Sequence, residues 1–299
     1  MPTSTEPAKR IQSQTSRTAE WTCLSRAASF FEPNPSFHGN DNVAPRLVPT
    51  PMRIMLQTRF GRFLFHRVLG GRGMYEYVIA RTRYIDAAFE LALSEGFHEI
   101  VLLGAGFDTR ALRLASAARA SIFELDVPVT QNAKIGRYHQ RHLSIPANLH
   151  LVAIDFDRES IAERLAASGF SSGKRCLFIL EGVLMYLQPE SVDTTFRTLQ
   201  SLGGPRSRIV FDYVRASVLR GEGSLYGQEG VTRSVEKVNE SWHFGLDPGQ
   251  VSSFLSTYGF ALVDHLDAAG LEKLYFTSEN GTISGRVNAT HCIVTAERP

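Results

Sequence analysis

The sequence has 299 residues, of which 43% are hydrophobic and 21% are charged, so the chain can bury a sizeable core. Its 32 Lys and Arg against 30 Asp and Glu leave a net charge of +2, too weak a field to indicate nucleic acid or an anionic membrane as a partner. The three cysteines, Cys23, Cys176 and Cys292, show no disulfide or metal-binding spacing, and we expect a reduced, cytoplasmic protein.

The N-terminal third of the chain shows no strand pattern. Residues 1–15 are polar, lack the apolar core of a signal peptide, and are expected to form a disordered tail. Residues 16–299 are predicted to form a single domain, in which residues 16–80 are a helical and looped cover punctuated by Pro, Gly and Asn. No run approaches 18 apolar residues, so no membrane span is predicted.

Strands and helices alternate through residues 97–214, after a helix predicted from Tyr77 to Leu93 by the spacing of its apolar residues. The predicted strands are EIVLLG, ASIFELD, LHLVAID, KRCLFILEG and RIVFDYV, and the helices between them begin near Asp108, Pro128, Asp157 and Pro189. Buried strands separated by helices pair in parallel with right-handed crossovers. The sequence therefore predicts a doubly wound α/β sheet.

The last part of the chain departs from this alternation. Residues 215–247 are a long stretch containing several glycines, which is typical of a lid or binding loop. Residues 248–299 are predicted to hold a helix, which begins at Asp247 and Pro248, and the two strands FALVDHL and THCIVTAE. We expect the 215–247 lid and the N-terminal cover to enclose the ligand together.

The ends of the predicted strands carry carboxylates, and ligands of parallel sheets bind outside those ends. The acidic positions are Glu124, Asp126, Asp155, Glu181 and Asp212. The first strand ends in Gly104 and Gly106, but a dinucleotide fingerprint would need a third glycine where Thr109 stands. Asp108 fills the anion site at the start of the following helix. These features favour a nucleoside without phosphates, and cationic S-adenosylmethionine fits them.

Two carboxylates compete for the ribose of such a ligand. Asp126 lies 20 residues beyond Gly106 at the strand tip and is expected to accept hydrogen bonds from both ribose hydroxyls. Glu124 shares the same strand face because alternate residues of a strand point the same way.

Five motifs in order resemble the leucine carboxyl methyltransferase family of S-adenosylmethionine-dependent enzymes, especially its bacterial and natural-product O-methyltransferase branch. They are RTRYID, LLGAGFDTRALRL, FELDVP, AIDF and LEGVLMYLQPE, between residues 77 and 214, and WHFGLDP at 242–248 is also similar. The resemblance implies a Rossmann-like sheet of seven strands whose last strand is antiparallel.

The resemblance also implies roles for single residues. Arg83 is expected to pair with the methionine carboxylate of the cofactor, and Gly104 to let the backbone approach the cofactor. Asp126 is expected to bind the ribose, and Asp155 and Phe156 are expected to bracket the adenine. Glu181, in an otherwise apolar run, should find its partner in the ammonium group of the cofactor.

The acceptor side is less clear from the sequence. Candidate substrate residues are Tyr186, Tyr213, Arg215 and Trp242, and the candidate bases are Tyr213 and His243. The histidines of HQRH, residues 139–142, have no carboxylate cluster to complete a metal site. Because a carboxylate is ionised at neutral pH and needs no base, the absence of an evident base slightly favours carboxyl methylation over phenol methylation.

The expected function is therefore O-methylation of a small molecule, in secondary metabolism, on a carboxylate or phenolic oxygen, with S-adenosylmethionine as cofactor. A protein C-terminal carboxyl methyltransferase and a non-catalytic cofactor-binding module remain the alternatives. No nucleic acid, membrane or metal is expected to take part. The sequence specifies neither the acceptor nor the oligomeric state.

Overall fold

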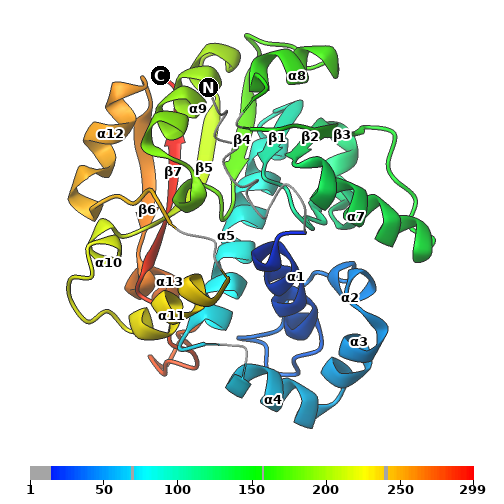
Figure 1. Ribbon diagram of the computed structural model, residues 1–299, viewed down its shortest axis with the longest axis vertical. Coiled ribbons are helices and arrows are strands. Elements are labelled where there is room, and N and C mark those ends of the chain that lie inside the picture. The colour runs from blue at the N-terminus through cyan, green and yellow to red at the C-terminus, as the bar shows by residue number, and fades with distance from the viewer. Residues whose placement is uncertain (1–14, 69–70, 157, 239–241) are drawn as a thin grey trace, which may run out of the picture.

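A single seven-stranded sheet with helices on both faces forms the body of the protein (Figure 1). The computed structural model describes residues 15–68, 71–156, 158–238 and 242–299, so the tail expected at the N-terminus lies almost wholly outside it. The strands are β1 (Glu99–Leu103), β2 (Ser121–Asp126), β3 (Leu149–Ala153), β4 (Cys176–Leu180), β5 (Arg208–Val214), β6 (Ala261–Leu266) and β7 (His291–Glu297).

The strand order is β3-β2-β1-β4-β5-β7-β6. Strands β1 to β5 pair in parallel, and β7 runs antiparallel between β5 and β6. The order reverses between β1 and β4, which is where a doubly wound sheet opens a crevice at the carboxyl ends of its strands. The predicted sheet, with its last strand antiparallel, is confirmed.

Alternation along each strand divides the core into two layers. In β1, Ile100 and Leu102 join one buried cluster, whereas Val101 and Leu103 join the other. The first cluster packs under α5 (Met74–Ser94), α7 (Pro128–Gln140) and α13 (Ala268–Tyr275). The second packs under α8 (Ile161–Ala167), α9 (Pro189–Leu202) and α12 (Val251–Thr257). Both faces of the sheet are thus covered, as continuous apolar strands require.

The segment expected as a cover contains α1 (Arg17–Phe30), α2 (Ala44–Leu47), α3 (Thr50–Gln57) and α4 (Arg59–Val68). Helix α1 lies against the loop that follows β1, because Ala19 faces Gly106 and Arg26 Nη2 donates to Phe107 O at 2.5 Å. This helix therefore crosses the edge where the parallel strands end (Figure 1).

Several elements differ from the sequence-based expectation. After β1 the chain forms only a short α6 (Arg110–Arg113) and a 3₁₀ turn (Ala115–Arg119), because Leu114 between them is extended. Helix α8 begins at Ile161, where the Ser160 hydroxyl accepts from the Glu163 amide, while the expected cap Asp157 lies outside the described residues. The lid segment is itself partly helical, with α10 (Ala216–Leu219) and α11 (Gln228–Val238).

Candidate cofactor and acceptor site

The loop after β1 needs glycine at two positions. Gly104 and Gly106 both have a positive φ, of 67° and 51°, which only glycine adopts readily. A Cβ on Gly104 would lie 2.5 Å from the Val183 side chain, and one on Gly106 would lie 3.0 Å from Ala19. The backbone of the loop after β1 therefore packs closely against Val183 and against Ala19 of α1.

A carboxylate occupies the place where a dinucleotide fold would hold a phosphate. Asp108 Oδ1 accepts a 2.7 Å hydrogen bond from the Arg110 amide at the start of α6. Thr109, at the position of the absent third glycine, donates its hydroxyl to Asp41 Oδ2 at 2.7 Å. Since a phosphate beside Asp108 would meet a like charge, this site suits a ligand without phosphates.

The structure separates the two carboxylates of β2. Asp126 lies at the strand tip and accepts from the Gly106 amide at 2.5 Å and the Val127 amide at 2.7 Å. Glu124 is buried deeper, with Oε2 2.5 Å from Lys134 Nζ, and Lys134 is itself buried. Glu124 thus already has a cation, and Asp126 is the carboxylate of β2 nearest the crevice.

Asp155 and Phe156 form the half-buried tip that follows β3. The Asp155 amide donates to Glu159 Oε2 at 2.8 Å, which holds the loop, and the Phe156 ring packs against the second core cluster. Both residues therefore lie beyond a strand end of the sheet, next to the end of β2.

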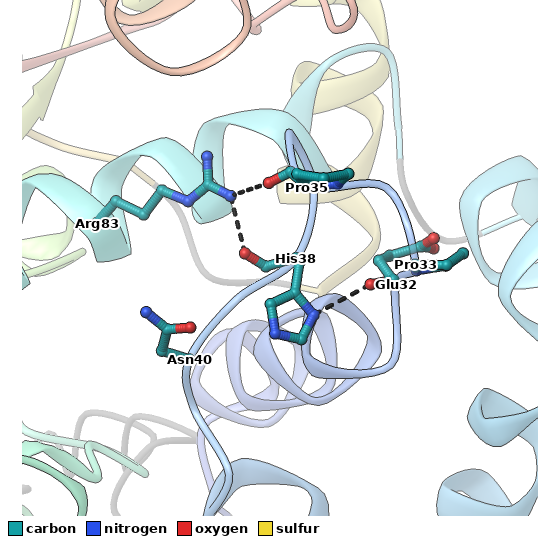
Figure 2. Close-up of a pocket in the computed structure, with 6 residues that line it drawn as sticks. All are labelled: Glu32, Pro33, Pro35, His38, Asn40 and Arg83. Atoms are coloured by element: carbon teal, nitrogen blue, oxygen red, sulfur yellow. Dashed lines mark hydrogen bonds between the residues drawn. The ribbon is translucent and has the colours of Figure 1, made fainter.

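Arg83 does not reach the strand ends. Its Nη2 donates to the carbonyls of Pro35 and His38, at 3.0 and 2.8 Å, beside a surface hollow (Figure 2). The hollow is lined by Glu32, Pro33, Pro35, His38, Asn40 and Arg83. The arginine that points to the strand ends is Arg81, two residues earlier, because helical spacing turns the side chains of Arg81 and Arg83 to different sides of α5.

Arg81 joins the ends of β4 and β5. Its Nη1 lies 2.6 Å from Asp212 Oδ2 and its Nε lies 3.1 Å from Glu181 Oε1. Arg110 Nη1 donates to the other oxygen of Glu181 at 2.9 Å. Burial opposes ionisation of Glu181, but Arg110 and Arg81 lower its pKa to about 2. The partners of Glu181 within the chain are these two arginines, where the sequence suggested the cofactor ammonium.

Glu181 belongs to a longer chain of buried ion pairs. Arg110 also contacts Asp108 and lies 2.7 Å from Asp86, which in turn lies 2.6 Å from Arg113. On the cover side, Arg26 lies 2.9 Å from Asp41. The ion-pair chain consists of four arginines and five carboxylates: Arg26, Asp41, Arg113, Asp86, Arg110, Asp108, Glu181, Arg81 and Asp212.

Tyr213 and Arg215 point away from this site. Asp212 faces α5, where Tyr77 donates to it at 2.8 Å, so the next residue of the strand must face the opposite layer. Tyr213 is fully buried there, with its hydroxyl 2.9 Å from His265 Nε2. Arg215 directly follows β5, and its Nη2 lies 3.3 Å from Asp267, which directly follows β6. The structure therefore directs Tyr213 into the core, and it pairs Arg215 with a carboxylate at the ends of β5 and β6.

The other acceptor candidates occupy the loop segments above β4 and β5. Tyr186 Oη lies 3.0 Å from Thr18 Oγ1 of α1. The backbone amide of His243 donates to Met185 O at 2.8 Å, but its side chain is exposed. Trp242 is half-buried against a small cluster formed by Met185, Val214, Val218 and Leu225, and its indole N–H has no hydrogen-bond partner within the described residues.

His291 is a residue that the sequence interpretation missed. It opens β7, and because β7 runs antiparallel it pairs with Val214 at the carboxyl end of β5. Its ring lies 4.7 Å from the Tyr77 ring and 5.4 Å from the Trp242 ring, measured between centroids. The antiparallel last strand, already expected from the sequence, could have indicated this position.

Hydrogen bonds set the tautomer of His291. Asn288 Nδ2 donates to the Arg72 carbonyl, which leaves Asn288 Oδ1 to accept from the Thr290 hydroxyl. The Thr290 oxygen lies 2.7 Å from His291 Nδ1 and can accept only if that nitrogen carries the proton. Burial lowers the pKa of His291 to about 4. His291 is therefore neutral at pH 7, with the lone pair on Nε2.

Metal-binding clusters and membrane-spanning helices are both absent from the described part of the chain. It contains no group of three or more His, Cys, Asp or Glu that could hold a metal ion. None of its helices is long and apolar enough to cross a membrane.

The seven-stranded order, with β7 antiparallel between β5 and β6, is that of Rossmann-like methyltransferases. The structure of a candidate methyltransferase from Thermobifida fusca superposes with a TM-score of 0.59 at 15% identity, and the match covers 99% of both chains, which shows the shared fold. The profile of the leucine carboxyl methyltransferase family matches residues 19–200, and the chain belongs to that family.

Curated relatives agree with this family. A candidate S-adenosyl-L-methionine-dependent methyltransferase of Mycobacteroides abscessus is 32% identical over 212 residues, which is 68% of each chain. YktD of Bacillus subtilis, with the same description, is 28% identical over 207 residues, 69% of this chain and 68% of the relative. The expected family is confirmed, and the descriptions of both relatives name the expected cofactor, S-adenosylmethionine.

Proposed function

We propose that the protein transfers a methyl group from S-adenosylmethionine to a carboxylate or phenolic oxygen of a small molecule, as an enzyme of secondary metabolism. The observation that carries the proposal is the acidic crevice, in which Asp108 fills the phosphate position and Asp126 lies at the tip of β2. A protein C-terminal carboxyl group as acceptor, or a binding module without activity, is the alternative.

The residues of the crevice divide into three binding roles. Asp126 would accept from the ribose hydroxyls, since Glu124 is held by Lys134. Asp155 and Phe156 would bracket the adenine, and Gly104 would leave room for the backbone to approach. The bound cofactor supplies an activated methyl group, so the main task of the protein is to hold the acceptor oxygen in line with it.

Arg81 would take the role that was expected of Arg83. It is nearly fully buried at the strand ends, whereas Arg83 binds carbonyls of the cover. The guanidinium lies between Glu181 and Asp212, so it can hold a carboxylate of the ligand only by sharing its donors with them. Arg81 therefore neutralises the two strand ends, and Nη2, which neither ion pair uses, would be its donor to the methionine carboxylate.

The acceptor would lie against Trp242, Tyr186 and the pair formed by Tyr77 and His291. The unpartnered indole N–H of Trp242 is a donor that an acceptor oxygen can use. A carboxylate placed there needs no base. A phenol would pass its proton to Nε2 of His291, because that nitrogen carries the lone pair and the ring is neutral at pH 7.

The test is methyl transfer from S-adenosylmethionine labelled in its methyl group, with panels of aromatic carboxylic acids, phenols and a peptide ending in leucine. Methyl esters release labelled methanol in mild base, whereas phenol ethers do not, so the product shows which oxygen was methylated. A labelled peptide would favour the protein carboxyl methyltransferase. Tight cofactor binding without transfer to any panel would favour a module without activity.

Single-turnover rates from pH 6 to pH 9 distinguish the two oxygens further, when the protein is compared with His291→Gln. With a carboxylate both rates stay flat over that range, because the acceptor is already ionised. With a phenol the variant loses its base, so its rate should rise about tenfold per pH unit until the phenol ionises.

A further inference from the structure

Helix α4 presents its apolar side to the outside. Phe60, Phe63 and Leu64 are 74%, 61% and 41% exposed, at the i, i+3 and i+4 spacing that makes one helix face. The inward side instead carries Arg62, 6% exposed, with Phe65. The helix lies at the outer end of the molecule, far from the sheet (Figure 1). An ordinary surface helix turns its apolar residues toward the core and its charged residues toward solvent, whereas α4 has apolar residues outside and a buried arginine inside.

Specific contacts fix this orientation. The Arg62 guanidinium donates to the carbonyls of Leu56 and Gln57, at 2.9 and 3.2 Å, which lie at the end of α3. A Cβ on Gly61 would lie 1.9 Å from Met55 O, so the two helices touch at their backbones. Because Arg62 and Gly61 must face α3, the phenylalanines must face outward.

The segment that forms this face carries charge of one sign, although Glu32, from outside the segment, lies 3.5 Å from Arg62 and 3.3 Å from His66. Between Asp41 and Glu76 the sequence has six arginines and neither Asp nor Glu, although the whole chain has a net charge of only +2. Arg59 and Arg67 are exposed on α4 itself, near its two ends. We call Phe60, Phe63, Leu64, Arg59 and Arg67 the α4 face. It combines apolar side chains with flanking cations, as peripheral membrane helices do.

We propose that the α4 face binds the surface of a membrane that contains anionic lipids. The phenylalanines and Leu64 would enter the boundary between headgroups and acyl chains, and the arginines would meet lipid phosphates. Ile54 of the neighbouring α3, 57% exposed, adds to the apolar surface. Binding of this kind is peripheral and requires no spanning helix.

Charge argues against a second copy of the chain as the occupant. In a symmetric dimer the same patch meets itself, so Arg59 and Arg67 would face cations of the partner. Residues 42–75 include no Asp or Glu, so this segment brings no anion of its own to such a contact, and Glu32 is already paired with Arg62 and His66. An anionic lipid surface provides the complementary charge. The proposal does not depend on the methyltransferase reaction.

Co-sedimentation of the full chain with vesicles tests the proposal. One set is phosphatidylcholine alone, and the other is an equal mixture with phosphatidylglycerol. We expect binding to the mixture, weakening as salt is added, and binding at least about tenfold weaker for Phe60→Ser/Phe63→Ser, since two large apolar side chains are lost. Arg59→Glu/Arg67→Glu should also lose the preference for the anionic mixture.

The matched control is Val263→Ser/Ile283→Ser, which changes two residues of other elements that are each 58% exposed. Its vesicle binding should equal that of the unchanged protein. Equal circular dichroism and equal affinity for S-adenosylhomocysteine would show that all variants are folded.

Three results would overturn the proposal. One is failure to sediment with either vesicle, and another is equal binding to both vesicles. The third is a dimer in solution that becomes a monomer in Phe60→Ser/Phe63→Ser without any vesicle binding, which would assign the α4 face to a second copy.

Discussion

Arg81 and Asp212 form a buried ion pair of 2.6 Å that joins helix α5 to the carboxyl end of β5. Asp212 is fully buried and also accepts from the Gly182 amide at 2.6 Å, which fixes the segment after β4. The pair therefore holds the crevice from one side and sets where the segment between β4 and α9 begins.

Replacement of Arg81 should be far more damaging than replacement of Arg83. Arg81→Met removes a positive partner from two buried carboxylates, Glu181 and Asp212. This loss should lower the unfolding free energy by about 3–5 kcal/mol. Arg83→Met removes hydrogen bonds to carbonyls of a half-exposed loop and should cost about 1 kcal/mol. Urea unfolding of both variants measures the difference, and equal losses would contradict the assignment.

Asp126 should govern cofactor affinity, while Glu124 should govern stability. Asp126→Asn removes charge-assisted hydrogen bonds worth about 2–4 kcal/mol, so the Kd for S-adenosylmethionine should rise at least about thirtyfold. Glu124→Gln leaves Lys134 buried without its counter-charge and should lower the unfolding free energy instead. Calorimetric titration of folded protein measures the first effect. The opposite ranking in Kd would show that Glu124 binds the ribose.

His291 should give the protein an acid-sensitive stability. Its pKa in the fold is about 4, below the value of about 6.5 in an unfolded chain. The contribution of neutral His291 to the unfolding free energy is therefore fully present above about pH 6.5. As the pH falls toward 4 this free energy decreases by roughly 3 kcal/mol, because the unfolded chain takes up the proton more readily. Unfolding free energies of the protein and of His291→Gln between pH 7 and pH 4 should converge by that amount. Parallel curves would show that His291 is not held neutral.

Replacement of Trp242 should weaken binding of the acceptor without changing the affinity for the cofactor. Trp242→Phe keeps most of the apolar contact with Met185 and Val214 but removes the unpartnered N–H donor. Loss of one hydrogen bond to an acceptor oxygen should raise the acceptor KM up to about tenfold. The Kd for S-adenosylhomocysteine should stay within about twofold, because the donor is remote from the Asp126 tip. A parallel rise in both constants would place Trp242 at the cofactor.

The parallel core was predictable because its signals are local. The strand that ends just before Gly104 and the helix beginning at Pro128 both follow from spacing, propensity and turn residues. Helix α13 was missed, because its eight residues between two strands give too short a period to recognise, although Asp267 caps it by accepting from the Gly270 amide.

The site was less predictable because it depends on which way side chains point. Tyr213 follows Asp212 in the sequence, yet the pleat of β5 directs it into the opposite core layer, where it meets His265. Arg81 and Arg83 differ only by their angle around α5, and the sequence alone did not show which of them faced the sheet. His291 reaches the site only because β7 pairs with β5 in its observed register.

The ion-pair chain has a consequence for cooperativity. It crosses the point where the strand order reverses, since Arg110 follows β1 while Glu181 follows β4 and Asp212 lies near the carboxyl end of β5. A fragment ending after β3 would leave Arg81 without either of its carboxylate partners, Glu181 and Asp212, while Arg110 would keep only Asp86 and Asp108. The two halves of the sheet should therefore fold as one unit, with no stable N-terminal half, even though each half alone has the strand-helix-strand pattern of a small domain.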